Sequence, residues 1–195
     1  MGVAKAYTTR VGSGPFPTEL TDEIGGGLQE RGKEFGATTG RARRCGWFDG
    51  VVVRYATRVN GLTSLAVTKL DVLDGCQELK LCTGYRYGGK LYREMPADLD
   101  TLMGCQPVYE TMRGWTTSTT GATSYATLPR EAKQYLKRIE ELAECGIDMS
   151  LGFGYMALTS ETELQAALAA LNGKRLYERL LIIIRAESVP LRRRA

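Results

Sequence analysis

The most informative absence from this chain of 195 residues is histidine, which does not occur at all. Without an imidazole, the chain cannot assemble the Ser-His or Cys-His pairs that activate a nucleophile. It also has no two cysteines at C-x-x-C spacing, and structural zinc sites depend on cysteine and histidine ligands. The sequence therefore excludes nucleophilic catalysis of this kind within the chain, and we expect no metal site in it.

The chain has five cysteines, an odd number that cannot all pair in disulfides within the chain. No segment is typical of a secretory signal peptide. We therefore expect reduced thiols in a cytoplasmic protein rather than a disulfide framework. The five are Cys45, Cys76, Cys82, Cys105 and Cys145.

The chain also lacks any apolar run near the ~20 residues that a membrane-spanning helix needs, so we expect no membrane partner. Its 43% hydrophobic and 25% charged residues are ordinary for a soluble globular protein. The length allows one sizeable core or two small domains. The net charge of +4 owes much to Arg192, Arg193 and Arg194, and we interpret it as solvated terminal charge rather than a nucleic-acid signal.

A last absence is the G-x-x-x-x-G-K-[ST] loop that cradles nucleotide phosphates. The run of glycines at 25–27 is not followed by Gly-Lys-Ser/Thr. Any binding of phosphate by this chain must therefore depend on other groups.

Those groups are concentrated in residues 36–44, where three arginines follow two threonines. Arginine presents a planar fork that holds a carboxylate or phosphate through two bonds, and threonine hydroxyls add short donors. The flanking glycines permit close approach of a ligand. We interpret the segment as an anion clamp, although a solvated basic turn fits the composition equally well. The segment reads Gly36-Ala37-Thr38-Thr39-Gly40-Arg41-Ala42-Arg43-Arg44.

The periodicity of the remaining chain predicts mixed helices and strands. Helices are expected at 23–31, 50–60 and 128–144, with a short helical turn at 96–100. Strands are expected at 4–8, 64–70, 78–86, 90–93 and 107–111, with a long polar loop at 114–126. Asp22 and Asp49 are suited to cap the first two helices.

Two apolar stripes are predicted on these helices. In the helix at 50–60 we expect a buried stripe of Val51, Val52, Tyr55 and Val59. In the helix at 128–144, which has a proline in its first turn, we expect a stripe of Leu136, Ile139, Leu142 and Ala143.

Five stretches of this sequence closely resemble the C-terminal part of adenylosuccinate synthetase. The resemblance runs from about Gly2 to about Gly146 and implies an α/β fold, as part of a mostly parallel-sheet, P-loop-type domain. Besides the segment at 36–44, it is carried by residues 2–19, by Cys45-Gly46-Trp47-Phe48-Asp49, by Asn60-Gly61-Leu62-Thr63-Ser64-Leu65 and by Thr68-Lys69-Leu70-Asp71.

This family joins inosine monophosphate to L-aspartate while hydrolysing GTP with Mg²⁺, so the resemblance implies those ligands. The residues implied to bind aspartate and inosine monophosphate are Ala37, Thr38, Thr39, Gly40, Arg41, Ala42 and Arg43. The residues implied to bind GTP are Arg43, Lys69, Leu70, Asp71, Ser150 and Gly152. Arg41 and Arg43 would also stabilise charge in the transition state.

The resemblance also implies that some catalytic groups of the family would come from a segment other than this chain. In the family, the phosphate loop, the carboxylate that binds metal and acts as base, and a catalytic histidine precede the text matched here. We therefore expect the chain to be inactive alone, with no magnesium ligand of its own. The full-length family also implies a possible homodimer and a cytoplasmic location.

After residue 146 the text changes, and we expect a separate βαβ tail at 147–195 that resembles the second half of an RNA recognition motif domain. Residues 152–158 resemble its first RNA-contacting strand, a helix is expected at 160–171, and an apolar strand at 180–184. Phe153 and Tyr155 would stack on unpaired bases of single-stranded RNA. The alternatives are core aromatics without RNA binding, a non-enzymatic nucleotide- or RNA-binding chimera, and a gene remnant without function.

Overall fold

A computed structural model of the chain describes residues 1–36, 40–120, 122, 125–149, 175–176 and 179–180. By its internal contacts the chain divides into two units, Met1–Gly154 and Tyr155–Ala195. In the second unit, β10 (Arg175–Leu176) pairs antiparallel with β11 (Arg179–Leu180). The helix expected at 160–171 lies outside the described residues.

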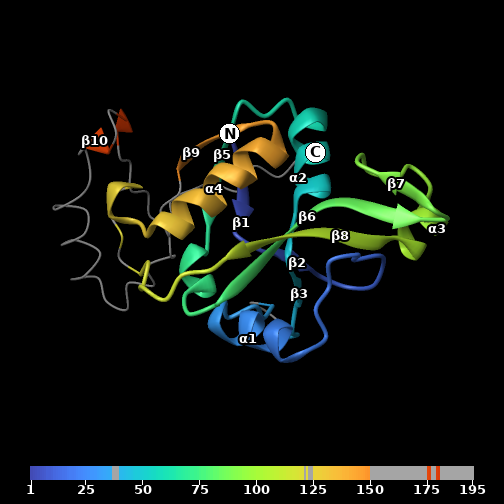
Figure 1. Ribbon diagram of the computed structural model, residues 1–195, viewed down its shortest axis with the longest axis horizontal. Helices are drawn as coiled ribbons and strands as arrows, with labels where there is room; N and C mark the ends of the chain where they lie inside the picture. The colour runs from blue at the N-terminus through green and yellow to red at the C-terminus, as the bar shows by residue number, and fades with distance from the viewer. Residues whose placement is uncertain (37–39, 121, 123–124, 150–174, 177–178, 181–195) are drawn as a thin grey trace, which may run out of the picture. The chain divides into compact units, whose positions relative to one another are not determined.

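A three-stranded parallel sheet forms part of the first unit (Figure 1). Its order is β1 (Gly2–Lys5), β5 (Ser64–Thr68), β9 (Gly146–Met149). The central strand β5 is buried over its first four residues, as an apolar run with parallel neighbours on both sides should be.

A second sheet joins β4 (Phe48–Asp49) in parallel to the long strand β6 (Glu78–Tyr87). Antiparallel strands β7 (Lys90–Tyr92) and β8 (Gln106–Arg113) extend this sheet on β6. A separate antiparallel pair is made by β2 (Thr8–Arg10) and β3 (Arg44–Gly46). The predicted α/β fold is confirmed, with parallel pairing in its central sheet and an antiparallel extension from β6.

Helix α1 (Glu23–Arg31) begins at the predicted cap, because the carboxylate of Asp22 accepts a hydrogen bond from the Gly25 amide at 3.0 Å. A glycine at 25 is required by packing: a Cβ there would collide with the carbonyl oxygen of Leu20. The close approach of these backbones explains why a helix tolerates a residue of low helix propensity.

Helix α2 (Gly50–Val59) is capped by Asp49 as predicted, but its predicted buried stripe is confirmed only in part. Val51 is buried, whereas Tyr55 is 48% exposed and Val59 is 64% exposed. The buried side instead includes Gly50 and Thr57, because α4 packs against this turn and a Cβ at Gly50 would lie 3.1 Å from Leu142. The position of α4 therefore decides which face of α2 is buried, and the apolar stripe of α2 alone did not predict that face.

Helix α4 (Arg130–Ala143) buries the predicted stripe and forms much of the core. Tyr135 is fully buried beside it, donates its hydroxyl to the carbonyl oxygen of Ala6 at 2.8 Å, and packs edge-on against Trp115 with centroids 5.9 Å apart. These contacts attach α4 to the segment that follows β1.

The remaining boundaries differ locally from those expected. The strand expected at 64–70 ends at Thr68, because the 3-10 turn η1 (Leu70–Leu73) follows. The helical turn expected at 96–100 is instead α3 (Leu99–Gly104), which starts where Asp98 accepts from the Thr101 amide at 2.8 Å. The loop expected at 114–126 is irregular over 114–120, and the short turn η2 (Tyr125–Thr127) begins at its end. Among the described helices, none is both long and apolar enough to cross a bilayer.

Replacing Ile139 with alanine should lower the free energy of unfolding by about 2–4 kcal/mol, because it removes a fully buried side chain and leaves a cavity. Urea unfolding should show a lower midpoint with an unchanged m-value. The control is Lys137→Ala on the exposed side of the same helix, which should change stability by less than about 0.5 kcal/mol. Equal effects of the two substitutions would contradict the assigned core face of α4.

Candidate functional site

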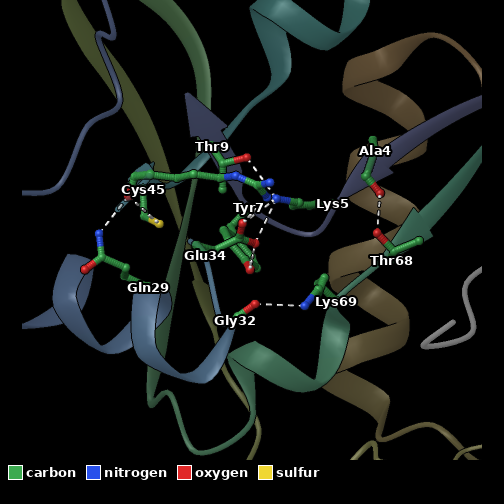
Figure 2. A network of polar contacts seen from close by, with 11 residues as sticks. Ala4, Lys5, Tyr7, Thr9, Gln29, Gly32, Glu34, Cys45, Thr68 and Lys69 are labelled. Carbon is green, nitrogen blue, oxygen red and sulfur yellow. Dashed lines mark hydrogen bonds and ion pairs between the residues drawn. The ribbon is translucent and has the colours of Figure 1, made fainter. Parts of the chain in front are cut away.

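A buried carboxylate, Glu34, is the centre of the polar network that lies beside the arginine segment (Figure 2). Glu34 is 1% exposed. Both of its oxygens accept from Lys5 Nζ at 2.8 Å. Its Oε1 also accepts from the Tyr7 hydroxyl at 2.6 Å, and its Oε2 accepts from Arg43 Nη1 at 3.0 Å. Three donors from two distant parts of the sequence therefore meet on one carboxylate.

The backbone around Glu34 holds the arginine segment as a closed loop. The Arg43 amide donates to the Glu34 carbonyl at 2.9 Å, and Phe35 pairs with Ala42 across an isolated antiparallel bridge. Further along, the Gly36 amide donates to the Arg41 carbonyl at 2.8 Å. The predicted ligand-binding residues Ala37, Thr38 and Thr39 lie outside the described residues.

The electrostatics of the network follow from burial and pairing. Burial of the Glu34 carboxyl opposes its ionisation, but the hydrogen bonds from Lys5, Tyr7 and Arg43 outweigh this and lower its pKa below the usual 4.5. Burial, together with the hydrogen bond to Glu34, raises the pKa of the Tyr7 hydroxyl far above its usual range. Glu34 is therefore ionised at neutral pH, while Tyr7 remains a proton donor.

Arg43 is held at both ends. Gln29 donates its side-chain amide to the Arg43 carbonyl at 2.7 Å, while Nη1 donates to Glu34. Its Nε is buried and has no hydrogen-bond partner in the structure. Arg43 also lines a cleft of about 300 Å³ together with Ala42 and residues of α1. A buried donor without a partner costs about 1–3 kcal/mol, so Arg43 has unused capacity to bind an anion.

The third arginine of the segment has a structural role. Arg44 donates Nε and Nη2 to the two oxygens of Glu19 at 2.7 and 2.5 Å, and Nη1 to the Gly14 carbonyl at 2.9 Å. Its guanidinium also lies 5.4 Å from the ring centroid of Phe16. Arg44 therefore ties β3 to the glycine- and proline-rich segment, while Arg41 lies exposed in the loop.

The predicted guanine-recognition residues come directly after β5. Lys69 adopts a left-handed conformation (φ 62°) and donates Nζ to the Gly32 carbonyl at 2.8 Å, just after α1 (Figure 2). Leu70 is buried in the core, and the side chain of Asp71 is exposed. The negative charge of Asp71 also contributes to the raised pKa of Tyr7. The two predicted motifs are thus neighbours, joined through Gly32 and Tyr7.

Sequence reasoning missed Glu34, Lys5 and Tyr7 as members of the site. Glu34 stands two residues before the arginine segment among other charged residues, and no periodicity marks it as buried. An acidic residue beside a cluster of arginines was the one available signal. The predicted residues Ser150, Gly152, Phe153 and Tyr155 lie outside the part of the chain that the structure describes.

Within the described residues, no group of three or more histidine, cysteine, aspartate or glutamate side chains is arranged to hold a metal ion. We therefore assign no magnesium ligand to them and derive no chemical step through a metal.

Comparisons with known proteins agree on one family. A family model described as adenylosuccinate synthetase matches residues 1–156. The adenylosuccinate synthetase of Geotalea daltonii is 60% identical over 147 residues, which are 75% of this chain and 34% of that protein. That of Carboxydothermus hydrogenoformans is 61% identical over 142 residues, or 73% of this chain and 33% of that protein.

Among solved structures, the fully ligated adenylosuccinate synthetase from Plasmodium falciparum matches with a TM-score of 0.71 and 38% sequence identity. The match covers 74% of this chain and 36% of that one. The chain therefore spans about a third of the length of the relatives it matches.

Replacing Glu34 with glutamine should destabilise the protein at pH 7 by about 2 kcal/mol or more, because Lys5 and Arg43 lose their shared partner. The pKa of Glu34 is depressed on folding, so its ionised form stabilises the fold above about pH 4.5 and this contribution is lost as pH falls below that value. Urea midpoints measured across this range should therefore fall less steeply in the variant than in the wild type. The control Glu30→Gln, at an exposed site in α1, should keep the wild-type slope.

Proposed function

The chain belongs to the adenylosuccinate synthetase family, and from this premise we propose that it supplies the aspartate and inosine monophosphate loop and the guanine-recognition motif of that enzyme. The reaction joins inosine monophosphate to L-aspartate and converts GTP to GDP and phosphate. The observation that carries the proposal is the contact of Lys69 with Gly32, which brings the guanine motif beside the segment that holds Arg43.

For the anionic substrates, we propose that Thr38, Thr39 and Gly40 hold the aspartate carboxylates. Arg41 would serve aspartate and inosine monophosphate, and Arg43 would extend this charge toward GTP. Ala37 and Ala42 would complete the loop. Guanidinium groups held in place before the reaction stabilise developing negative charge without reorganising, which suits a reaction on phosphates. The unpartnered Nε of Arg43 supports this role.

For guanine, we propose that the exposed carboxylate of Asp71 accepts from the two adjacent N–H donors of the base, an edge that adenine does not present. Leu70 fixes the position of Asp71 by packing in the core, and Lys69 fixes it by its bond to Gly32. Ser150 and Gly152 would line the same base. A polar group left without its partner by the wrong base gives strong discrimination.

We further propose that residues 1–146 correspond to the C-terminal portion of the family's domain and that 147–195 form a distinct tail resembling half of an RNA recognition motif domain. The similarity of the first unit to the family supports the first part. Past residue 146, β9 still pairs with β5 as far as Met149, the first unit runs to Gly154, and the family match continues to residue 156. RNA binding by Phe153 and Tyr155 has no supporting observation, and we do not propose it.

The complete reaction also requires a phosphate loop, a metal-binding carboxylate that acts as base, and a catalytic histidine. Magnesium would neutralise phosphate charge when bound, and we assign it no ligand in this chain. We propose that these groups come from another segment, that the assembled enzyme is cytoplasmic, and that it forms a homodimer.

Replacing Asp71 with asparagine should weaken binding of GTP by roughly tenfold to a hundredfold, because a hydrogen bond to a charged group contributes about 1.5–3 kcal/mol. Binding of ATP should change little, so the ratio of the two dissociation constants would fall toward one. Titration with fluorescent GTP and competition by ATP would measure both. Asp100→Asn, at an exposed position in α3, serves as the control and should keep the wild-type preference. An unchanged preference in the Asp71 variant would refute the assigned role.

The purified chain of 195 residues should form no adenylosuccinate from inosine monophosphate, aspartate, GTP and magnesium, because it has no histidine and no phosphate loop. A coupled assay that follows both GDP and adenylosuccinate would measure this. A synthetase of the family in full length provides the positive control. Product formed at more than a trace rate would contradict the proposed division of the catalytic groups.

A further inference from the structure

The guanidinium of Arg43 is engaged on one side only. Its Nη1 donates to Glu34 Oε2 at 3.0 Å, while its Nε is buried without a hydrogen-bond partner. In a guanidinium, the hydrogens of Nε and Nη2 point the same way along one edge. This edge offers two parallel bonds to the oxygens of a carboxylate or phosphate. The bond to Glu34 therefore leaves the two-bond edge of Arg43 for another partner.

The neighbouring Arg44 shows the opposite arrangement in the same segment. Its Nε and Nη2 both donate to the carboxylate of Glu19, so its two-bond edge is already occupied. Both arginines pair with glutamates, yet only Arg43 keeps the edge that grips an oxyanion. The two arginines differ because Glu34 contacts Nη1 of Arg43, whereas Glu19 contacts Nε and Nη2 of Arg44.

The position of Glu34 is fixed from several directions. Lys5 Nζ contacts both carboxylate oxygens at 2.8 Å, and the Tyr7 hydroxyl holds Oε1 at 2.6 Å. Tyr7 itself is 2% exposed, and a Cβ at Gly32 would collide with its hydroxyl. A carboxylate with these restraints cannot turn to offer Arg43 a two-bond contact without losing Tyr7 or Lys5.

We propose that Glu34 is a positioning residue, which holds Arg43 by Nη1 so that the Nε–Nη2 edge meets an oxyanion of the substrate. Lys5 and Tyr7 hold the carboxylate in turn. The identity of the oxyanion, a carboxylate or a phosphate, rests on the function proposed above. Nε is buried in this conformation, so the oxyanion reaches it only when the atoms that cover it shift.

Side-chain NMR of arginine tests the positioning without any ligand. The measured quantity is the rate of rotation about the Arg43 Nε–Cζ bond, with signals assigned from their loss in Arg43→Lys. Glu34→Gln should speed this rotation at least about tenfold, since it replaces a charge-assisted hydrogen bond by a neutral one. Glu34→Asp keeps the charge on a shorter side chain and should also speed it. The control Glu19→Gln should speed rotation in Arg44 and leave Arg43 unchanged.

An unchanged Arg43 rotation rate in both Glu34 variants would overturn the positioning role. If Glu34→Gln does not fold, Glu34→Asp decides the question by the same measurement.

Titration of the same samples with L-aspartate, GTP and inorganic phosphate tests the ligand half of the inference. In the wild type, the Arg43 Nε–H signal should shift on binding, and in Glu34→Gln the dissociation constant should rise by about tenfold or more, as expected for a misplaced binding group. Equal affinity in the two proteins would overturn the inference. If none of the three probes shifts the Arg43 signal in the wild type, oxyanion binding at Arg43 is contradicted, and this result also counts against the proposed function. The rotation rates would still decide the role of Glu34.

Discussion

A charged carboxylate almost out of contact with water is the constraint on which the described site depends. Burying Glu34 would be unfavourable without partners, and the structure supplies Lys5, Tyr7 and Arg43 as donors. Because the first two come from the N-terminal strand and its continuation, the network joins β1 to the arginine segment (Figure 2). The hydrogen bonds that stabilise the buried charge of Glu34 thus also fix the orientation of the Arg43 guanidinium.

The surrounding fold makes this arrangement possible by bringing strand ends and helix ends together. Tyr135 in α4 holds the carbonyl of Ala6, next to Tyr7, and Lys69 at the end of β5 holds the end of α1. Ligand sites in α/β proteins commonly lie at the carboxyl ends of parallel strands, and β1 and β5 both end here.

Much of this could be predicted from sequence where local physics decides. Asp22 and Asp49 cap their helices because a short carboxylate accepts hydrogen bonds from the first free amides. The spacing of apolar residues alone predicts the buried face of α4. The motifs that resemble the family, such as those at 36–44 and 68–71, likewise identified it. Sequence could not reveal the whole buried side of α2, because Tyr55 and Val59 continue its apolar stripe but are exposed. The residue types alone could not separate Arg43 from Arg44. The family resemblance assigned a ligand role to Arg43 only, and the structure adds that the two guanidiniums differ through the positions of Glu34 and Glu19.

The central claim, that Glu34 and Arg43 act as one unit, is tested most directly by a double-mutant cycle. The free energies of unfolding of the wild type, Glu34→Gln, Arg43→Gln and the double variant would be measured in urea at neutral pH. We predict that the two substitutions are not additive, with a coupling energy of about 1–2 kcal/mol, as expected for groups in direct contact within one network. Additivity to within about 0.3 kcal/mol would contradict the account.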